Sequence, residues 1–282
     1  MSSKHADEPI GSQLERSGWR QGSIIANQDV AKIIEQCQID FELSTYDIAI
    51  VITHSCDIAN NNLKQLPFIE IIMGKQIKAL DGNLTFNKNS RVLHSTLHKK
   101  TSEISIFEEV FFELKVFETI KVKKEIFLSI SPSPNLLLLD RELKGFTDWL
   151  SAKVKRPAFP TSFNDLIEKV DSGSKKRRKS AKKLNKNLVG IYIKLFPNQE
   201  VKGDENYSVN LLGIVSSDFD EDMGSLKHSL ESYAEIMRDA GMDVKCAIAR
   251  KSEVSMELIE EYDRFYYDDL SLRFNTETPP NL

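Results

Sequence analysis

The stretch that most constrains the fold is residues 46–57, which read Tyr-Asp-Ile-Ala-Ile-Val-Ile-Thr-His-Ser-Cys-Asp. Residues 48–52 are all apolar, so an extended segment here has two apolar faces. A strand of this kind lies inside a sheet, because a strand with one solvated face alternates apolar with polar residues. Residues 47–53 are therefore predicted to form a central strand. Reactive side chains that follow it in the sequence are expected to lie at the end of this strand.

Three side chains capable of chemistry follow this strand: His54, Cys56 and Asp57. If the strand continues, His54 and Cys56 share one face and Asp57 lies on the other, whereas a turn at Ser55 regroups them. In a nuclease or other hydrolase, His54 would lower the pKa of Cys56 or accept a proton from a hydroxyl or water. The alternative is a buried thiol, an imidazole bonded to the backbone and a carboxylate that caps a turn. His54, Cys56 and Asp57 are the candidate catalytic residues.

A zinc hypothesis adds His94 and His98 to His54 and Cys56, since an i, i+4 pair shares a face if residues 92–100 are helical. The surrounding sequence is rich in strand-forming residues, which argues against a helix there. Paired Cys-x-x-Cys spacing is also absent. No metal site is predicted, and the cofactor stays unknown.

Two acidic patterns are weighed as sites. Glu113 and Lys115 have the Glu-x-Lys form of some nucleases, with Asp81 as an upstream partner, but on a strand they also describe a solvated face with a salt bridge. Residues 218–222 resemble the start of a calcium loop that lacks its glycine, because Met223 stands at the sixth position. These carboxylates are expected to lie at the N-terminus of a helix.

Other enzyme classes leave no motif in the chain. There is no Gly-x-x-x-x-Gly-Lys loop, no Gly-x-Gly-x-x-Gly turn and no Gly-x-Ser-x-Gly elbow. Nucleotide-hydrolysing, dinucleotide-binding and α/β-hydrolase functions therefore have no sequence support.

The pattern along the chain predicts an α+β protein with an N-terminal mostly β domain and a C-terminal α/β domain. The predicted divisions are a disordered N-terminus (1–17), a mostly β domain with a helical end (18–170), a basic linker or helix start (171–187), an α/β domain (188–272) and a frayed tail (273–282). At 282 residues the chain exceeds the usual length of one domain, which favours two.

Within the N-terminal domain the apolar periods predict helices and strands in alternation with polar breaks. Helices are predicted at 28–38, 142–154 and 162–170, strands at 67–73, 110–120 and 125–130, and a hairpin at 84–93.

Within the C-terminal domain, strands are predicted at 189–196, 207–215 and 244–249, and helices at 225–240 and 254–266. The helix at 225–240 places Leu226, Leu230, Tyr233 and Met237 on one face. The helix at 254–266 is inferred from an apolar stripe that ends at Phe265. A strand, a helix and a strand within about forty residues imply parallel pairing of the two strands.

Charge is distributed unevenly along the chain. Residues 1–150 carry 17 Lys+Arg against 20 Asp+Glu, residues 151–200 carry 13 against 4, and residues 201–282 carry 8 against 18, which gives -3, +9 and -10. The basic middle indicates either contact with a polyanion or neutralisation by the acidic flanks.

The basic middle contains the candidate nucleic-acid-binding residues, which lie between 175 and 186. They are Lys175, Lys176, Arg177, Arg178, Lys179, Lys182 and Lys183. Such a run can hold phosphates by counterion release. Because no aromatic residue interrupts it, binding would be directed to the backbone and independent of sequence.

Composition predicts a cytoplasmic protein with no membrane contact. The three cysteines, Cys37, Cys56 and Cys246, are odd in number and widely spaced, so they give no disulfide framework and are expected to be structural thiols. No stretch approaches the ~18 consecutive apolar residues of a membrane helix.

Three phrases carry a resemblance: residues 18–22 (Gly-Trp-Arg-Gln-Gly), residues 51–57, and Trp149 with residues 156–160 (Arg-Pro-Ala-Phe-Pro). They resemble segments of uncharacterised bacterial proteins associated with mobile elements and phage defence, over roughly the first 160 residues. The resemblance implies an accessory or effector protein of antiviral defence, acting through contacts with nucleic acid or another defence protein. The competing expectations are a nuclease or other hydrolase, and a binder of nucleic acid through the basic run.

Overall fold

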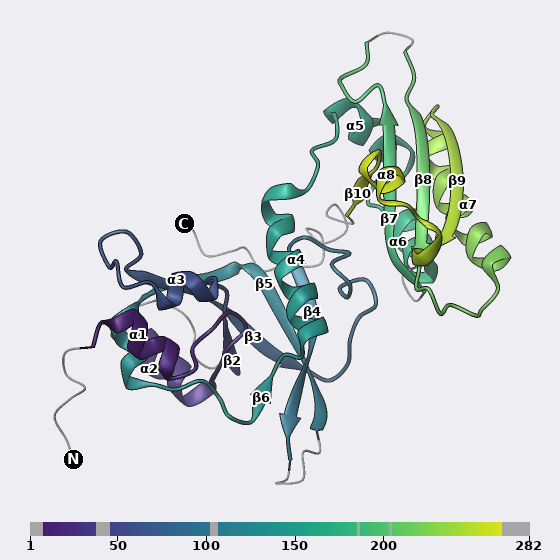
Figure 1. Cartoon of the computed structure of the whole chain (residues 1–282). Helices are drawn as coiled ribbons and strands as arrows, with labels where there is room; N and C mark the ends of the chain where they lie inside the picture. The colour runs from purple at the N-terminus through teal and green to yellow at the C-terminus, as the bar shows by residue number, and fades with distance from the viewer. Residues whose placement is uncertain (1–7, 38–45, 102–106, 185–186, 203–204, 267–282) are drawn as a thin grey trace. The chain divides into compact units, whose positions relative to one another are not determined.

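The computed structural model describes residues 8–37, 46–101, 107–184, 187–202 and 205–266 (Figure 1). The chain forms two compact units, one made of Met1–Leu80 and Arg91–Leu150 and the other of Asp81–Ser90 and Ser151–Leu282. Both helices and strands are present, which confirms the predicted α+β class. The short segment Asp81–Ser90 belongs with the C-terminal half of the chain.

A six-stranded antiparallel sheet forms the first unit, in the order β1-β2-β3-β5-β4-β6. Its strands are β1 (Ile24–Ala26), β2 (Ile48–Val51), β3 (Phe68–Ile77), β4 (Val92–Lys100), β5 (Phe107–Lys123) and β6 (Leu136–Leu137). All four residues of β2 are buried, and β2 pairs with β1 on one side and β3 on the other. The central strand predicted from its two apolar faces is confirmed.

The two faces of this sheet build two separate cores, because side chains alternate along each strand. Ala49 and Val51 pack in a core that includes residues of α1 (Ile10–Arg16) and α2 (Asn27–Cys37). Ile48 and Ile50 pack in the other core, with Trp149 of α4 (Asp140–Lys155). The helices predicted near 28–38 and 142–154 are present.

Three segments of the first half differ from the prediction. Residues 10–16, expected to be disordered, form α1, because Leu14 is buried and Gly11 lies against the carbonyl of Ala59, where no side chain fits. Residues 125–130, expected to be a strand, lie mostly in the 3-10 helix η2 (Lys124–Ser129), whose buried residues Lys124 and Phe127 are three positions apart. The hairpin expected at 84–93 is absent, since residues 84–86 form no strand and Phe86 has a φ of 53°, which no strand adopts.

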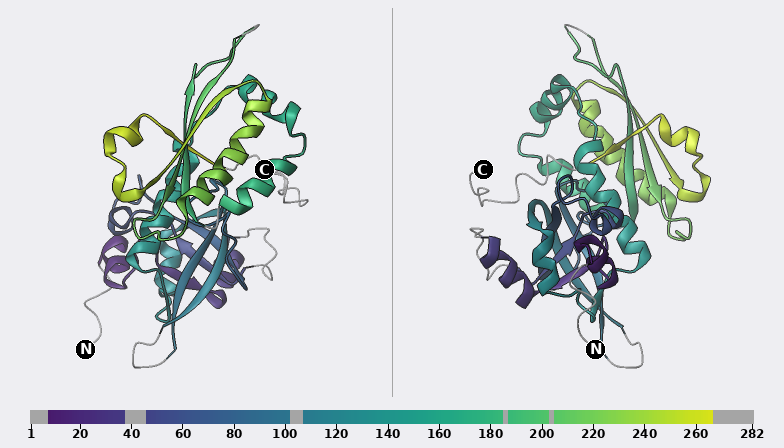
Figure 2. Two further views of the ribbon diagram at one scale, coloured as in Figure 1. Left: turned by 90° about the vertical axis from the view of Figure 1, so that its right-hand side faces the viewer. Right: turned by 60° about the vertical axis from the view of Figure 1, so that its left-hand side comes forward.

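The second unit contains a four-stranded sheet in the order β10-β7-β8-β9. Its strands are β7 (Leu188–Phe196), β8 (Ser208–Val215), β9 (Asp243–Arg250) and β10 (Asp263–Phe265). β8 and β9 pair in parallel and are joined by α7 (Met223–Asp239), as the strand–helix–strand pattern predicts. Figure 2 shows α5 (Thr161–Val170), α6 (Lys175–Leu184) and α7 on one side of the sheet and α8 (Met256–Glu260) on the other.

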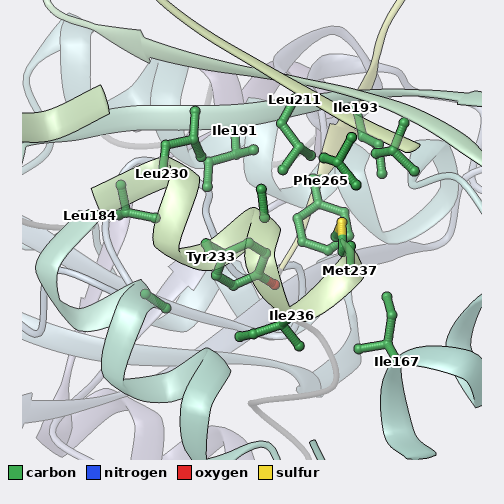
Figure 3. Close-up of a cluster of buried hydrophobic side chains, with 14 of the residues drawn as sticks. Ile167, Leu184, Ile191, Ile193, Leu211, Leu230, Tyr233, Ile236, Met237 and Phe265 are labelled. Atoms are coloured by element: carbon green, nitrogen blue, oxygen red, sulfur yellow. The ribbon is translucent and has the colours of Figure 1, made fainter. Parts of the chain in front are cut away.

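One core joins these three helices to the sheet (Figure 3). The four residues predicted to share a face of the 225–240 helix, Leu226, Leu230, Tyr233 and Met237, are all buried in it. Leu184 anchors α6 in the same core. The basic helix is therefore held on one side by apolar packing and has its other side available to solvent.

The single helix predicted over 254–266 is wrong. α8 covers only Met256–Glu260, and β10 begins at Asp263, after residues 261 and 262. Phe265 enters the core from β10, which pairs with β7, whereas Leu258 stays exposed. The apolar residues that predicted one helix over 254–266 are divided between two elements, α8 and β10, which have different packing partners. The predicted tail at 273–282 lies outside the described residues, and among the helices that the structure describes none has the length and apolar character to cross a bilayer.

Candidate nucleic-acid interface

The predicted catalytic residues lie in a turn that begins soon after β2. His54 is the N-cap of the short helix α3 (Ser55–Ala59), and its Nδ1 accepts a hydrogen bond of 3.3 Å from the backbone N–H of Cys56. His54 and Cys56 are exposed and Asp57 is half-buried. The strand has ended before Ser55, so its alternation does not reach these residues, and the expected burial of the Cys56 thiol is wrong. A catalytic role for the three residues stays a prediction.

The turn is fixed at both ends by hydrogen bonds from distant segments. Gln21 donates from its backbone N–H to Ser55 Oγ (3.1 Å) and from Nε2 to the carbonyl oxygen of Ile52 (2.8 Å). Lys124 Nζ donates to the carbonyl oxygens of Asp57 (2.6 Å) and Asn60 (2.7 Å) at the other end. Burial lowers the pKa of Lys124, whose side chain is fully covered. Lys124 thus caps α3, a role that no local pattern in the sequence indicates.

Replacing Lys124 by Met is expected to lower the free energy of unfolding of the first unit by about 2–4 kcal/mol, because two carbonyl oxygens lose their donor. Urea denaturation followed by tryptophan fluorescence measures this, since Trp19 packs against Phe127 of η2. Lys121→Met is the matched control, because the Lys121 side chain is 69% exposed. An unfolding midpoint equal to that of the control would contradict the capping role.

The Glu-x-Lys pair lies in a half-buried ionic network on β5. Lys115 Nζ is 3.5 Å from Glu113 and 3.4 Å from Glu118, and His94 Nε2 is 3.3 Å from Glu113. The hydrogen bond from His94 lowers the pKa of Glu113, whereas burial raises the pKa of Glu118. Asp81, the expected acidic partner, belongs to the other unit. The predicted salt bridge is therefore present, but on a half-buried face of the sheet and not on the solvated face that was expected.

The histidines considered for zinc lie on β4, so the helical spacing that would place them side by side is wrong. Residues four apart on a strand lie about 13 Å apart. Instead, the ring of His98 lies edge-on to Phe107. No group of three or more His, Cys, Asp or Glu among the described residues is arranged to hold a metal ion.

Two further sequence predictions concern structural roles. Asp222 accepts hydrogen bonds from the backbone N–H groups of Gly224 (2.8 Å) and Ser225 (3.1 Å), so the acidic run caps α7 as predicted.

Burial raises the pKa of the Cys37 thiol. Burial, together with nearby Glu231, raises the pKa of the Cys246 thiol to about 12. Both thiols stay protonated at neutral pH, as structural thiols do.

The basic segment forms the helix α6, the second of its two predicted states. The Asp171 carboxylate accepts hydrogen bonds from the backbone N–H groups of Lys176 (3.0 Å) and Arg177 (2.9 Å), which caps the helix. Arg177 Nε donates to Asp171 (3.1 Å), and its Nη2 donates to Glu168 (2.9 Å). Asp171 and Arg177 are buried. The guanidinium of Arg177 is thus paired with carboxylates inside the fold, and this pairing fixes the start of α6.

The exposed cations of α6 form a stripe. Lys175, Lys179 and Lys183 recur every fourth residue, so they share one face, and all three are exposed. Within the described residues, no hydrogen bond or ion pair joins their ammonium groups to the rest of the chain. Lys176 is also exposed but lies 3.8 Å from Asp239. Arg178 is half-buried, and the side chain of Lys182 lies outside the described residues, as does residue 186. We call Lys175, Lys179 and Lys183 the lysine stripe.

Comparison with protein-family models, with curated proteins and with solved structures finds no match to this chain. The function is therefore argued from the sites themselves. The lysine stripe is the strongest of them, because its charged groups are exposed, evenly spaced and without a described intramolecular partner.

Proposed function

We propose that the protein binds the phosphate backbone of nucleic acid, independently of sequence, through the lysine stripe. The observation that carries the proposal is the exposure of three ammonium groups on one face of α6. Residues four apart on a helix are separated by about 6 Å along its axis. Duplex DNA presents a phosphate about every 1.7 Å of its axis, so each lysine finds its own phosphate.

The stripe supplies affinity and no base readout. Lysine ammonium groups bind phosphates as point charges, and contacts to phosphate carry no sequence information directly. No aromatic residue interrupts α6, so bases have nothing to stack on along this helix. Arg177, the cation best suited to bidentate recognition of guanine, is held by Asp171 and Glu168.

The biological setting that we propose is bacterial antiviral defence, with the protein as a cytoplasmic accessory or effector. What supports it is the resemblance of residues 18–22 and 51–57 to proteins of that setting. The predicted C-terminal α/β domain would hold the basic helix as a fixed surface. The alternative, a nuclease or other hydrolase using His54, Cys56 and Asp57, has less support, because His54 Nδ1 is already bonded to a backbone N–H.

The salt dependence of binding tests the proposal. For a labelled duplex of about 20 base pairs titrated between about 25 and 200 mM NaCl, the logarithm of the binding constant is expected to fall linearly with the logarithm of salt, with a slope of about -2.7 or steeper. Two duplexes of unrelated sequence are expected to bind equally. A slope near zero, or tight binding of only one of the sequences, would refute backbone binding through the stripe.

A further inference from the structure

β9 is an edge strand whose outer side is open. Figure 1 shows it beside β8, and among the described strands it pairs only with β8. The backbone N–H of Asp243 donates to the carbonyl oxygen of Tyr207 (3.0 Å), so the backbone groups of residues 243, 245, 247 and 249 face β8. Residues 244, 246, 248 and 250 therefore direct their N–H and C=O groups away from the sheet. A row of this kind is a template for pairing with another strand.

Only the two ends of this outer row are covered. Arg238 donates from Nη2 to the carbonyl oxygen of Val244 (2.9 Å) at one end. The Glu253 carboxylate accepts a hydrogen bond from the backbone N–H of Arg250 (2.8 Å) at the other end. Within the part of the chain that the structure describes, no hydrogen bond covers the outward backbone groups of residues 246 and 248. The middle of the strand is therefore the accessible part of the edge.

The middle of β9 lacks the features that keep edge strands apart. Proteins usually protect a sheet edge with charged side chains, proline or a bulge. Residues 246–249 read Cys-Ala-Ile-Ala, without charge or proline, and their pairing with β8 has no register shift. Cys246 and Ile248 pack against the core beneath the helices, so Ala247 lies on the opposite face of the sheet, where it is exposed. A small side chain there leaves room for a second strand.

The sequence of β9 is complementary to itself about Ala247. In an antiparallel pair of two copies centred there, Cys246 of each copy exchanges both N–H···O bonds with Ile248 of the other. Ala247 faces Ala247 of the second copy. At each end, Asp243 comes opposite Lys251 of the other copy, and both residues are exposed. The pair thus matches small with small and acid with base.

The covered ends fit the same register. Val244 of one copy faces Arg250 of the other, so the two covered groups are the acceptor and the donor of a single interstrand bond. Other registers are less favourable. A pair centred on residue 245 places Lys245 opposite itself, and a pair centred on residue 248 places Lys245 opposite Lys251.

We infer that β9 pairs antiparallel with β9 of a second copy of this chain, about a twofold axis at Ala247. The pairing joins two four-stranded sheets into one, and each copy contributes the same surface. One pair of strands buries less than the ~1,200 Å² of a standard interface, so the dimer is transient and depends on concentration. The inference uses no residue of the lysine stripe and does not rest on the proposed function.

Self-association of the full chain tests the inference. In sedimentation equilibrium between about 5 and 200 µM, the average mass is expected to rise from that of a monomer toward that of a dimer. Ala247→Glu is expected to weaken this association about fivefold or more, because two carboxylates then face each other across the axis. Ala79→Glu is the matched control, since Ala79 is an exposed alanine of the other unit, and it should associate as the wild type does.

Disulfide trapping tests the register. The background is Cys56→Ser, because Cys56 is exposed, and the oxidant is oxidised glutathione. Ala247→Cys is expected to form a covalent dimer, since the two facing Cα atoms are about 4.5 Å apart, within reach of a disulfide. Lys245→Cys is exposed on the same face but is expected to stay monomeric, because its two copies lie four positions apart along the pair, about 13 Å. Electrophoresis without reductant measures both.

The outcomes separate this inference from the proposed function. A monomer mass at every concentration would overturn the inference, and so would equal cross-linking of Ala247→Cys and Lys245→Cys. The variant with Gln at all three positions of the lysine stripe is expected to self-associate as the wild type does. Ala247→Glu is expected to bind duplex as the wild type does. Loss of duplex binding with self-association intact would therefore count against the proposed function alone.

Discussion

Changing Lys175, Lys179 and Lys183 together to Gln is expected to lower the affinity for duplex DNA about 100-fold at about 0.1 M salt. The physical reason is that each lysine that neutralises a phosphate releases condensed counterions, and the three contributions multiply. Gln matches Lys in helix propensity, so α6 is expected to stay folded and only its charge changes. Fluorescence anisotropy with a labelled duplex measures the loss.

The matched control removes the same number of charges elsewhere. Lys144, Lys153 and Lys155 of α4 are exposed, and Gln at these three positions gives the same net charge as the stripe variant. This control is expected to bind duplex within about threefold of the wild type, because these lysines lie on another helix and are not part of the lysine stripe. An equal loss in both variants would show that total charge, and not the stripe, sets the affinity.

Replacing Asp171 by Ala is expected to lower the free energy of unfolding of the second unit by about 3 kcal/mol, because the change takes from the buried Arg177 its buried carboxylate partner and removes the cap of α6. The side chains of Asp171 and Arg177 are only 3% and 9% exposed. Glu168 stays bound to Arg177 and limits the loss. Urea denaturation followed by far-UV circular dichroism measures it, since both tryptophans, Trp19 and Trp149, belong to the other unit.

Asp239→Ala is the control for this prediction. Asp239 is 53% exposed and lies 3.8 Å from Lys176, an exposed pair expected to contribute less than about 1 kcal/mol. If Asp171→Ala unfolds at the same urea concentration as this control, the buried pair does not organise α6. If it is destabilised as expected, its duplex affinity should fall as well, because the stripe needs a folded helix to align its lysines.

The parts of the fold that sequence patterns predicted are those with a long apolar period. The central strand β2 and the helices α4 and α7 each have a period that only one element type satisfies, and the parallel pairing of β8 with β9 follows from the helix between them. The failures are short elements. α1 and η2 depend on single contacts such as Leu14 in the core, and β10 competes with a helical stripe that ends at the same Phe265.

The sequence indicates which cations lie in the candidate site on α6, but not which of them are buried and which are exposed. The run of cations is evident in the sequence, but the division between the buried Arg177 and the exposed lysines depends on Asp171 and Glu168, which a preceding turn brings into contact. The contact between Arg264 and Phe86 joins residues 178 positions apart, so no local pattern could indicate it. The position of Lys124 beneath α3 is equally non-local.

The most direct test of the central claim is the difference in salt dependence between the wild type and the variant in which Lys175, Lys179 and Lys183 are Gln. Both proteins are titrated with the same duplex over the same range of salt. If the lysine stripe makes three phosphate contacts, the slope of log binding constant against log salt becomes less negative by about 2.7 in the variant. Equal slopes for the two proteins would contradict the claim that this helix binds the nucleic-acid backbone.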